Sequence, residues 1–152
     1  MIQNNLIDKK VKIMATTSYI NQGHATADQV DRVTTILRWT YGLVPIVAGA
    51  DKFTHILTNW DKYLAPVVTD IIPLQPHTFM LIVGVIEIIA GIIVLVRPKL
   101  GSLIVGLWLV GIAINLLLTG QYFDIAVRDA VMAIGAFCLY MLSNGEKDVS
   151  KI

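Results

Sequence analysis

The sequence predicts an all-α integral membrane protein, a bundle of four transmembrane helices with a short amphipathic interfacial helix between the first and the second. Of its 152 residues, 55 % are apolar and 15 % are charged, which is too apolar a composition for one small soluble core. We therefore expect a polar cytoplasmic N-terminal segment over residues 1–32, a membrane domain over residues 33–142 and a cytoplasmic tail over residues 143–152.

Four stretches are candidates for membrane spans, because a span needs about 20 mainly apolar residues. The second, third and fourth are clear, at His77–Val96, Leu100–Leu118 and Ile125–Leu142. The first runs from Val33 to about Leu57 and is less apolar because it carries charged residues. We still count it as a helix. At 152 residues, four helices leave little material for a soluble domain, so a single bundle is the expected architecture.

The connections between the spans also follow from the sequence. Arg97-Pro98-Lys99 predicts a tight cytoplasmic turn, because proline ends a helix. Thr119–Asp124 predicts a short outer loop. The stretch Asn59–Pro76 carries apolar residues at helical spacing, which predicts a short amphipathic helix on the outer surface. An ordinary loop is the alternative, and Pro66 fits a helix only in its first turn.

The orientation follows from the positive residues, which are enriched in short cytoplasmic segments. A cytoplasmic N-terminus puts most of them inside, leaving three outside, at Lys52, Lys62 and Arg128. We therefore expect both termini to be cytoplasmic, whether translation starts at Met1 or at Met14. The N-terminal stretch lacks the layout of a cleavable signal peptide, so we expect the first span to insert uncleaved.

Each span carries a stripe of small or polar residues at helical spacing, which indicates the face turned toward the other helices. We expect these stripes to meet in a common interior and the remaining surfaces to face lipid. Their members are Arg38, Gly42, Pro45, Gly49 and Lys52 in the first span; His77, Gly84, Glu87 and Gly91 in the second; Gly101, Trp108, Gly111 and Asn115 in the third; and Asp129, Ala133, Ala136 and Tyr140 in the fourth.

Glu87 is the first candidate for function, because it lies in the middle of the most apolar span. A charge at that depth costs a few kcal/mol, so it normally faces protein or water and has a partner. Pro45 frees the carbonyl of Tyr41 at a similar depth, and a protonated Glu87 could donate to it. Alternatively, the long side chain of Arg38 could reach an ionised Glu87. The sequence leaves both partners open.

A second polar cluster is expected at the outer mouth of the bundle. Together with Glu87 it forms our predicted ligand-binding or proton-linked site, although each member also has a purely structural interpretation as an anchor, a cap or an interhelical hydrogen bond. The predicted site residues are Glu87, Arg38, Lys52, Asp51, Asn115, Asp129 and Arg128.

His55 and His77 flank the same outer connection and give a weak signal for a cofactor, since imidazole binds haem and metals. No other His or Cys on that side completes a ligand set, so we expect neither haem nor a metal there. Cys138 is the single cysteine, which excludes a dithiol relay within this chain. We find no catalytic residues, no phosphate-binding loop and no basic aromatic surface for nucleic acid. The isolated chain is therefore not expected to be an enzyme.

Several short motifs resemble the DoxX-like family of small four-helix membrane proteins. They are Arg38-x-x-x-Gly42, Gly49-Ala50-Asp51-Lys52-Phe53, Glu87-x-x-x-Gly91 and the run from Tyr122 to Asp129. The family includes the small membrane subunit of thiosulfate:quinone oxidoreductase and proteins of redox or oxidative-stress complexes. The Gly49, Lys52, Glu87 and Asp129 pattern carries over, without a catalytic role.

The resemblance implies a non-catalytic or quinone-associated subunit of a redox complex in the bacterial inner membrane. Quinone is then the implied cofactor, and membrane lipids and other membrane protein subunits are the implied partners; a homo-oligomer is also compatible with the four stripes. Two alternatives stay open. A small transporter or proton or ion pathway would be centred on Glu87, whereas a membrane scaffold or assembly factor would use Glu87 only to hold helices together.

Overall fold

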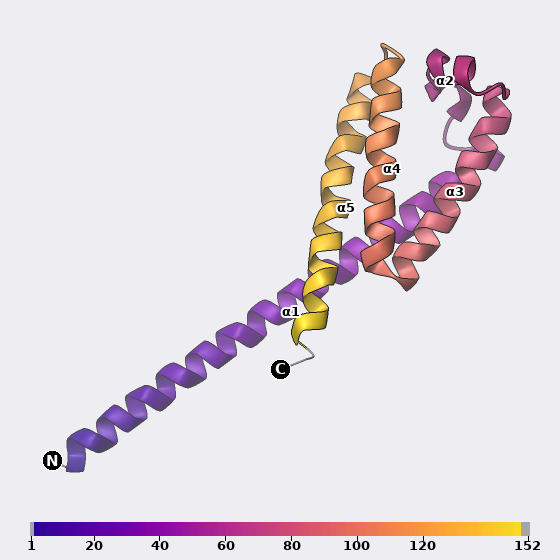
Figure 1. The fold of residues 1–152 in the computed structure, drawn as a ribbon. Helices are drawn as coiled ribbons and strands as arrows, with labels where there is room; N and C mark the ends of the chain where they lie inside the picture. Colours follow the sequence, from indigo (N-terminus) through magenta and orange to yellow (C-terminus); the bar gives the residue numbers. More distant parts are fainter. Residues whose placement is uncertain (1, 150–152) are drawn as a thin grey trace. The chain divides into compact units, whose positions relative to one another are not determined.

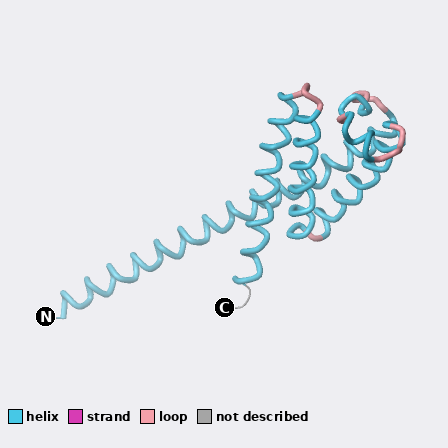
Figure 2. Tube along the Cα trace, turned by 45° about the horizontal axis from the view of Figure 1, so that its top comes forward, coloured by secondary structure: helices cyan, strands magenta, loops and turns pink. Residues whose placement is uncertain are grey.

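The computed structural model describes residues 2–149, and all regular structure in that range is helical (Figure 1). The loops in the described range are short and lie at helix ends (Figure 2). Met1, and residues 150–152 of the expected tail, lie outside the described residues. In chain order the elements are α1 Ile2–Thr54, the 3-10 helix η1 Trp60–Tyr63, α2 Pro66–Ile71, α3 Pro76–Val96, α4 Pro98–Leu118 and α5 Phe123–Val149.

Four of the described helices are long and apolar enough to cross a membrane. This result confirms the all-α fold with four candidate spans and suggests a multi-pass membrane protein. The candidate segments are Thr26–Thr54, Pro76–Val96, Pro98–Leu118 and Phe123–Asn144.

The chain divides into two units, Met1–Thr35 and Ile36–Ile152, which we describe separately. The described part of the first unit belongs to α1, which is helical from Ile2. This stretch contains a single glycine, Gly23, and no proline, so nothing in its sequence interrupts a helix. The boundary between residues 32 and 33 stays a prediction. The end of α1 from Ile36 and all later elements belong to the second unit.

Proline starts three of the helices in the second unit, at Pro66, Pro76 and Pro98. The first residue of a helix has no intrahelical partner for its amide, so proline costs nothing there. Arg97 alone joins α3 to α4, which confirms the predicted tight turn. A side chain at Gly101 would collide with the backbone of Val94, so the turn requires a small residue there.

The connection between α1 and α3 differs from the single amphipathic helix that we predicted over Asn59–Pro76. It contains two short pieces, η1 and α2, separated by Leu64 and Ala65 in extended conformation. Pro66 explains the break, because it lacks an amide hydrogen and disfavours a helical conformation in the preceding residue. Pro66 does occupy the first position of α2, where a proline is tolerated.

Pairs of glycines bring α1 and α3 close together. A β-carbon added at Gly49 would lie 2.5 Å from the carbonyl oxygen of Gly84, and one added at Gly84 would lie 2.7 Å from the carbonyl oxygen of Gly49. One helical heptad along, a β-carbon at Gly91 would collide with the carbonyl of Gly42. The antiparallel helices therefore touch backbone to backbone, as small residues allow in membranes.

Tyr41 fastens α1 to α5. Its side chain is buried in a cluster with Val94, Val105 and Leu139, and its hydroxyl donates a hydrogen bond to the carbonyl of Met132 at 2.7 Å. A β-carbon at Gly135 would overlap that hydroxyl. The aromatic ring of α1 therefore packs into a gap that a glycine leaves on α5.

The predicted interior stripes are buried for the most part. Arg38 and His77 are exposed, which is contrary to the prediction for those two positions, whereas the accessible Gly111 lines a cavity between the helices. Large apolar side chains cover the outward surfaces of the same helices, such as Ile86, Leu107 and Ile134. The buried members of the stripes are Gly42, Gly49, Lys52, Gly84, Glu87, Gly91, Gly101, Asp129, Ala133 and Ala136.

Candidate functional site

A buried ion pair joins α1 to α3. The Nζ atom of Lys52 lies 2.5 Å from Oε2 of Glu87, and the two side chains are 4 % and 7 % exposed. Glu87 thus bonds to neither partner that the sequence suggested, the carbonyl of Tyr41 or the side chain of Arg38. Arg38 donates instead to the carbonyl of Leu95, with its Nε atom at 3.0 Å. Glu87 therefore has a partner, as predicted, but a different one.

The glycine contacts explain why Lys52 can reach Glu87. The β-carbon of Lys52 packs beside Gly84, one helical turn from Glu87. Side chains on a helix lean toward its N-terminus. Because α1 and α3 are antiparallel, the Lys52 and Glu87 side chains lean toward each other along the contact between the helices.

Two tryptophans complete the surroundings of the pair. The indole nitrogen of Trp108, on α4, donates to Oε1 of Glu87 at 3.4 Å. The ammonium of Lys52 lies 4.0 Å from the ring centroid of Trp60, at the start of η1. Buried charges need a partner and further polar contacts to offset lost hydration, and these aromatic groups supply them.

Asp51, the neighbour of Lys52, organises the end of α1. Its carboxylate accepts hydrogen bonds from the amides of Ile56 and Leu57, at 2.9 and 3.0 Å, and from the indole nitrogen of Trp60 at 2.7 Å. The hydroxyl of Thr54 lies 3.2 Å away as a further donor. Asp51 therefore stops the helix at Thr54, earlier than the predicted end near Leu57, and positions Trp60 above Lys52.

Replacing Asp51 by alanine is expected to loosen this connection. These hydrogen bonds are only part-buried, and losing one bond of this kind costs about 0.5–1.5 kcal/mol in stability. We expect faster hydrogen exchange at the amides of Ile56 and Leu57, measured by mass spectrometry in detergent. Asp70→Ala, at an exposed position of α2, is the matched control and should leave those amides unchanged. Equal exchange in both variants would show that Asp51 does not hold the connection.

Asn115 fastens the same connection to α4. Its side-chain amide donates to the carbonyl of Tyr63 at 2.7 Å, while its oxygen accepts from the amide of Ala65 at 3.0 Å. The ring of Tyr63 also meets that of Tyr122 edge to face, with 4.8 Å between centroids. Asn115 thus bonds to the backbone of a connection, where the sequence suggested a bond to another helix.

Arg128 and Asp129 form an adjacent pair on α5. The Nε atom of Arg128 lies 3.2 Å from Oδ1 of Asp129. The aspartate is buried and the arginine is exposed. Asp129 is thus a second buried carboxylate in the interior of the bundle. It lines the same cavity as Lys52 and Glu87.

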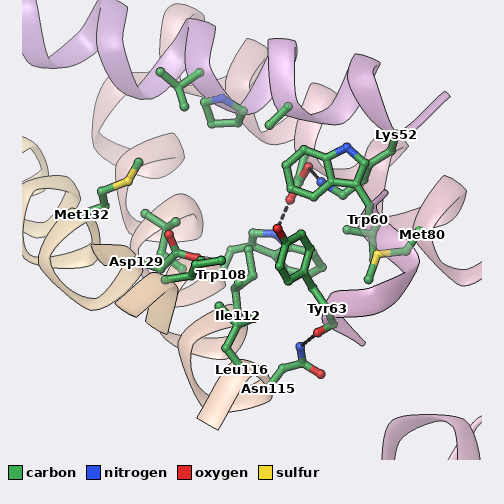
Figure 3. A pocket seen from close by; sticks show the side chains of 18 of the residues that line it. Lys52, Trp60, Tyr63, Met80, Trp108, Ile112, Asn115, Leu116, Asp129 and Met132 are labelled. Atoms are coloured by element: carbon green, nitrogen blue, oxygen red, sulfur yellow. Dashed lines mark hydrogen bonds and ion pairs between the residues drawn. The ribbon is translucent and has the colours of Figure 1, made fainter. Parts of the chain in front are cut away.

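A pocket of about 770 Å³ lies between the helices and is capped by η1. Figure 3 shows side chains from several elements converging on it, including Lys52, Trp60, Tyr63, Trp108 and Asp129. Such a volume is typical of pockets for small molecules. Most of the lining is apolar or aromatic, with two cations, Lys52 and Arg128, and two carboxylates, Glu87 and Asp129. The formal charges of these four side chains cancel.

Five of the seven predicted site residues line this pocket, namely Glu87, Lys52, Asn115, Asp129 and Arg128. Arg38 and Asp51 serve the helix contacts and the helix end described above. That the five bind a ligand or a proton stays a prediction. The sequence placed Trp108 on the interior stripe of the third span, seven positions before Asn115, but not among the site residues, although that spacing was a usable signal. Trp60 and Tyr63 were expected only on the apolar face of the connection, and nothing in the sequence showed that they turn into the bundle.

His55 and His77 come together outside this pocket. Their rings are stacked, with 5.3 Å between centroids and 26° between planes. Asp61 joins them, since one ligand atom from each of the three residues lies within 4.8 Å of the others. The third potential ligand is thus a carboxylate and not a further His or Cys.

Comparison of the chain with protein-family models, with curated proteins and with solved structures gives no match. The functional inference therefore depends on the residues and geometry described above.

Proposed function

We propose that this chain is a multi-pass protein of the bacterial inner membrane that binds a quinone in the central pocket, as a non-catalytic subunit of a redox complex. The DoxX-like motifs motivate the complex. The observation that carries the ligand class is the aromatic pocket around the Lys52 and Glu87 pair. A quinone is a flat apolar ring with carbonyl oxygens, which matches stacking surfaces combined with a few hydrogen-bond donors.

The charge balance of the pocket supports a neutral ligand. An added anion would meet Glu87 and Asp129, and an added cation would meet Lys52 and Arg128. The ammonium of Lys52 carries three donors, of which Glu87 occupies one. A neutral acceptor such as a quinone carbonyl can therefore bond to Lys52 without adding charge. The rings of Trp60 and Trp108 provide the stacking surfaces.

The placement in the membrane belongs to the same proposal. Both termini are cytoplasmic by the distribution of positive residues, and the connection made of η1 and α2 lies at the outer surface. Val67 and Ile71 of α2 are 42 % and 74 % exposed, which suits contact with lipid at the interface. Other membrane subunits and lipids would cover the apolar outer faces of the helices.

Replacing Trp108 by leucine is expected to weaken quinone binding about tenfold, which corresponds to roughly 1.4 kcal/mol. The substitution removes a stacking surface and the indole donor to Glu87. The measurement is calorimetric titration of a short-chain quinone analogue into the detergent-solubilised protein. Trp39→Leu is the matched control, because Trp39 is 54 % exposed and lies outside the pocket. Equal affinities in the two variants would contradict quinone binding in this pocket.

Purification of the native protein in mild detergent tests the rest of the proposal. A subunit should migrate with a larger assembly, and solvent extraction should recover quinone. A lone chain without quinone would count against both the partner and the ligand.

A proton pathway is the second candidate, favoured by the buried ionisable groups Lys52, Glu87 and Asp129 around one cavity. Proteoliposomes with a pH-sensitive dye distinguish the two functions. A pathway should give proton flux that Glu87→Gln abolishes while the variant still folds. The quinone proposal expects no flux above empty liposomes.

A further inference from the structure

Three potential metal ligands meet where α1 ends and α3 begins. His55 directly follows α1, Asp61 is the second residue of η1, and His77 is the second residue of α3. Their ligand atoms lie within 4.8 Å of one another, although the residues span 22 positions in the chain. None of the three belongs to the lining of the quinone pocket, so this cluster is a separate feature of the molecule.

The fold holds the backbone of each residue in place. The amide of His55 donates to the carbonyl of Asp51 at 2.7 Å, and His55 takes a left-handed conformation with φ 54°. Asn59 accepts a hydrogen bond from the amide of Asp61 at 3.1 Å and so caps η1. Pro76 starts α3 immediately before His77. The cluster is therefore built on anchored positions at helix ends.

The side chains of the cluster are incompletely satisfied. Nδ1 of His77 lies 3.6 Å from Oδ2 of Asp61, beyond a normal hydrogen bond. Oδ1 of Asp61 is buried and has no hydrogen-bond partner among the described residues. A buried carboxylate oxygen without a donor is costly and calls for an explanation. A bound cation would satisfy that oxygen and would also explain two imidazole rings stacked beside it.

We propose that His55, Asp61 and His77 bind a divalent transition-metal ion such as Zn²⁺ or Co²⁺. Imidazole nitrogen and carboxylate oxygen suit these ions. Ligand bonds of about 2.0–2.1 Å place the donors of a tetrahedral ion roughly 3.4 Å apart. The separations in the cluster, which reach 4.8 Å at most, must therefore shorten by up to about 1.4 Å. The side chain of His77 is 54 % exposed and has room to rotate.

The bound ion would tie the ends of α1, η1 and α3 together. Three protein ligands leave a fourth position open for water or another ligand, as in zinc sites that carry out chemistry. This proposal is independent of the quinone proposal, because it uses different residues.

The test is a titration of Co²⁺ into the full-length, tag-free protein, followed by its visible absorption bands and by competition with Zn²⁺. We expect one equivalent of Co²⁺ per chain, and binding at least tenfold weaker in His77→Ala and in Asp61→Asn. His24→Ala is the matched control, since it removes the one histidine outside the cluster. It should bind as the wild type does.

Melting temperatures with and without metal distinguish loss of the metal site from misfolding of a variant. Without metal, His77→Ala should melt as the wild type does, because its ring is largely exposed. Addition of Zn²⁺ should raise the melting temperature of the wild type and of His24→Ala, but not that of His77→Ala or Asp61→Asn. Absence of Co²⁺ bands in the wild type, or equal binding by all variants, would overturn the site.

Discussion

Glu87→Ala is expected to lower the free energy of unfolding by about 3–5 kcal/mol, because it leaves the ammonium of Lys52 buried without its counter-charge. The two side chains are 4 % and 7 % exposed, so water cannot readily replace the lost carboxylate. Thermal unfolding in detergent, followed by tryptophan fluorescence, measures the effect. Glu87→Gln should lose less, since its amide oxygen can still accept from Lys52.

The double variant Lys52→Met with Glu87→Met is the control for this prediction. Replacing a buried ion pair by apolar side chains of similar volume is often neutral or stabilising. We therefore expect the double variant to be more stable than Glu87→Ala. If Glu87→Ala unfolds at the wild-type temperature, the pair is not buried in the folded protein, and the pocket described here is wrong.

Gly49→Ala is expected to destabilise the contact between α1 and α3 by about 1–3 kcal/mol, as overpacking does in a filled interior. The new methyl group would lie 2.5 Å from the carbonyl oxygen of Gly84, and a backbone atom cannot rotate away. The helices would have to separate, which would also pull Lys52 away from Glu87. The same unfolding measurement reports the loss.

Gly111→Ala provides the matched control on α4. A β-carbon there meets nothing within 4 Å. Alanine favours a helix over glycine by up to about 1 kcal/mol, so this variant should be as stable as the wild type or slightly more stable. If Gly49→Ala and Gly111→Ala behave alike, the close approach of α1 and α3 does not exist.

Neighbouring residues show where prediction from the sequence reached its limit. Asp51 and Lys52 were both expected in the polar cluster at the mouth, and Lys52 also on the interior stripe. Asp51 bonds to the connection after α1, whereas Lys52 pairs with Glu87, a partner that the sequence did not suggest. Successive side chains on a helix point about 100° apart, so adjacent charges need not share surroundings. Which groups each side chain contacts depends on which helix or loop packs against that face of α1.

The predicted partners of Glu87 failed for a related reason. Depth along the helices placed Tyr41, Pro45 and Arg38 as candidates, but it took no account of the direction in which side chains lean. The heptad spacing of Gly42 with Gly49 and of Gly84 with Gly91 was visible in the sequence. Aligning these pairs in antiparallel register would have placed Lys52 beside Gly84 and directed it toward Glu87.

Sequence alone determined the four long apolar helices, their tight proline turn and the inward position of Glu87. These features depend on hydropathy, backbone hydrogen bonding within one helix and the cost of an isolated charge in an apolar span, which are all local properties. Only the tertiary structure decided the ion pair with Lys52, the aromatic pocket, and the meeting of His55, Asp61 and His77. Those depend on the register between helices and on a connection whose shape is set by the hydrogen bonds of Asp51 and Asn115.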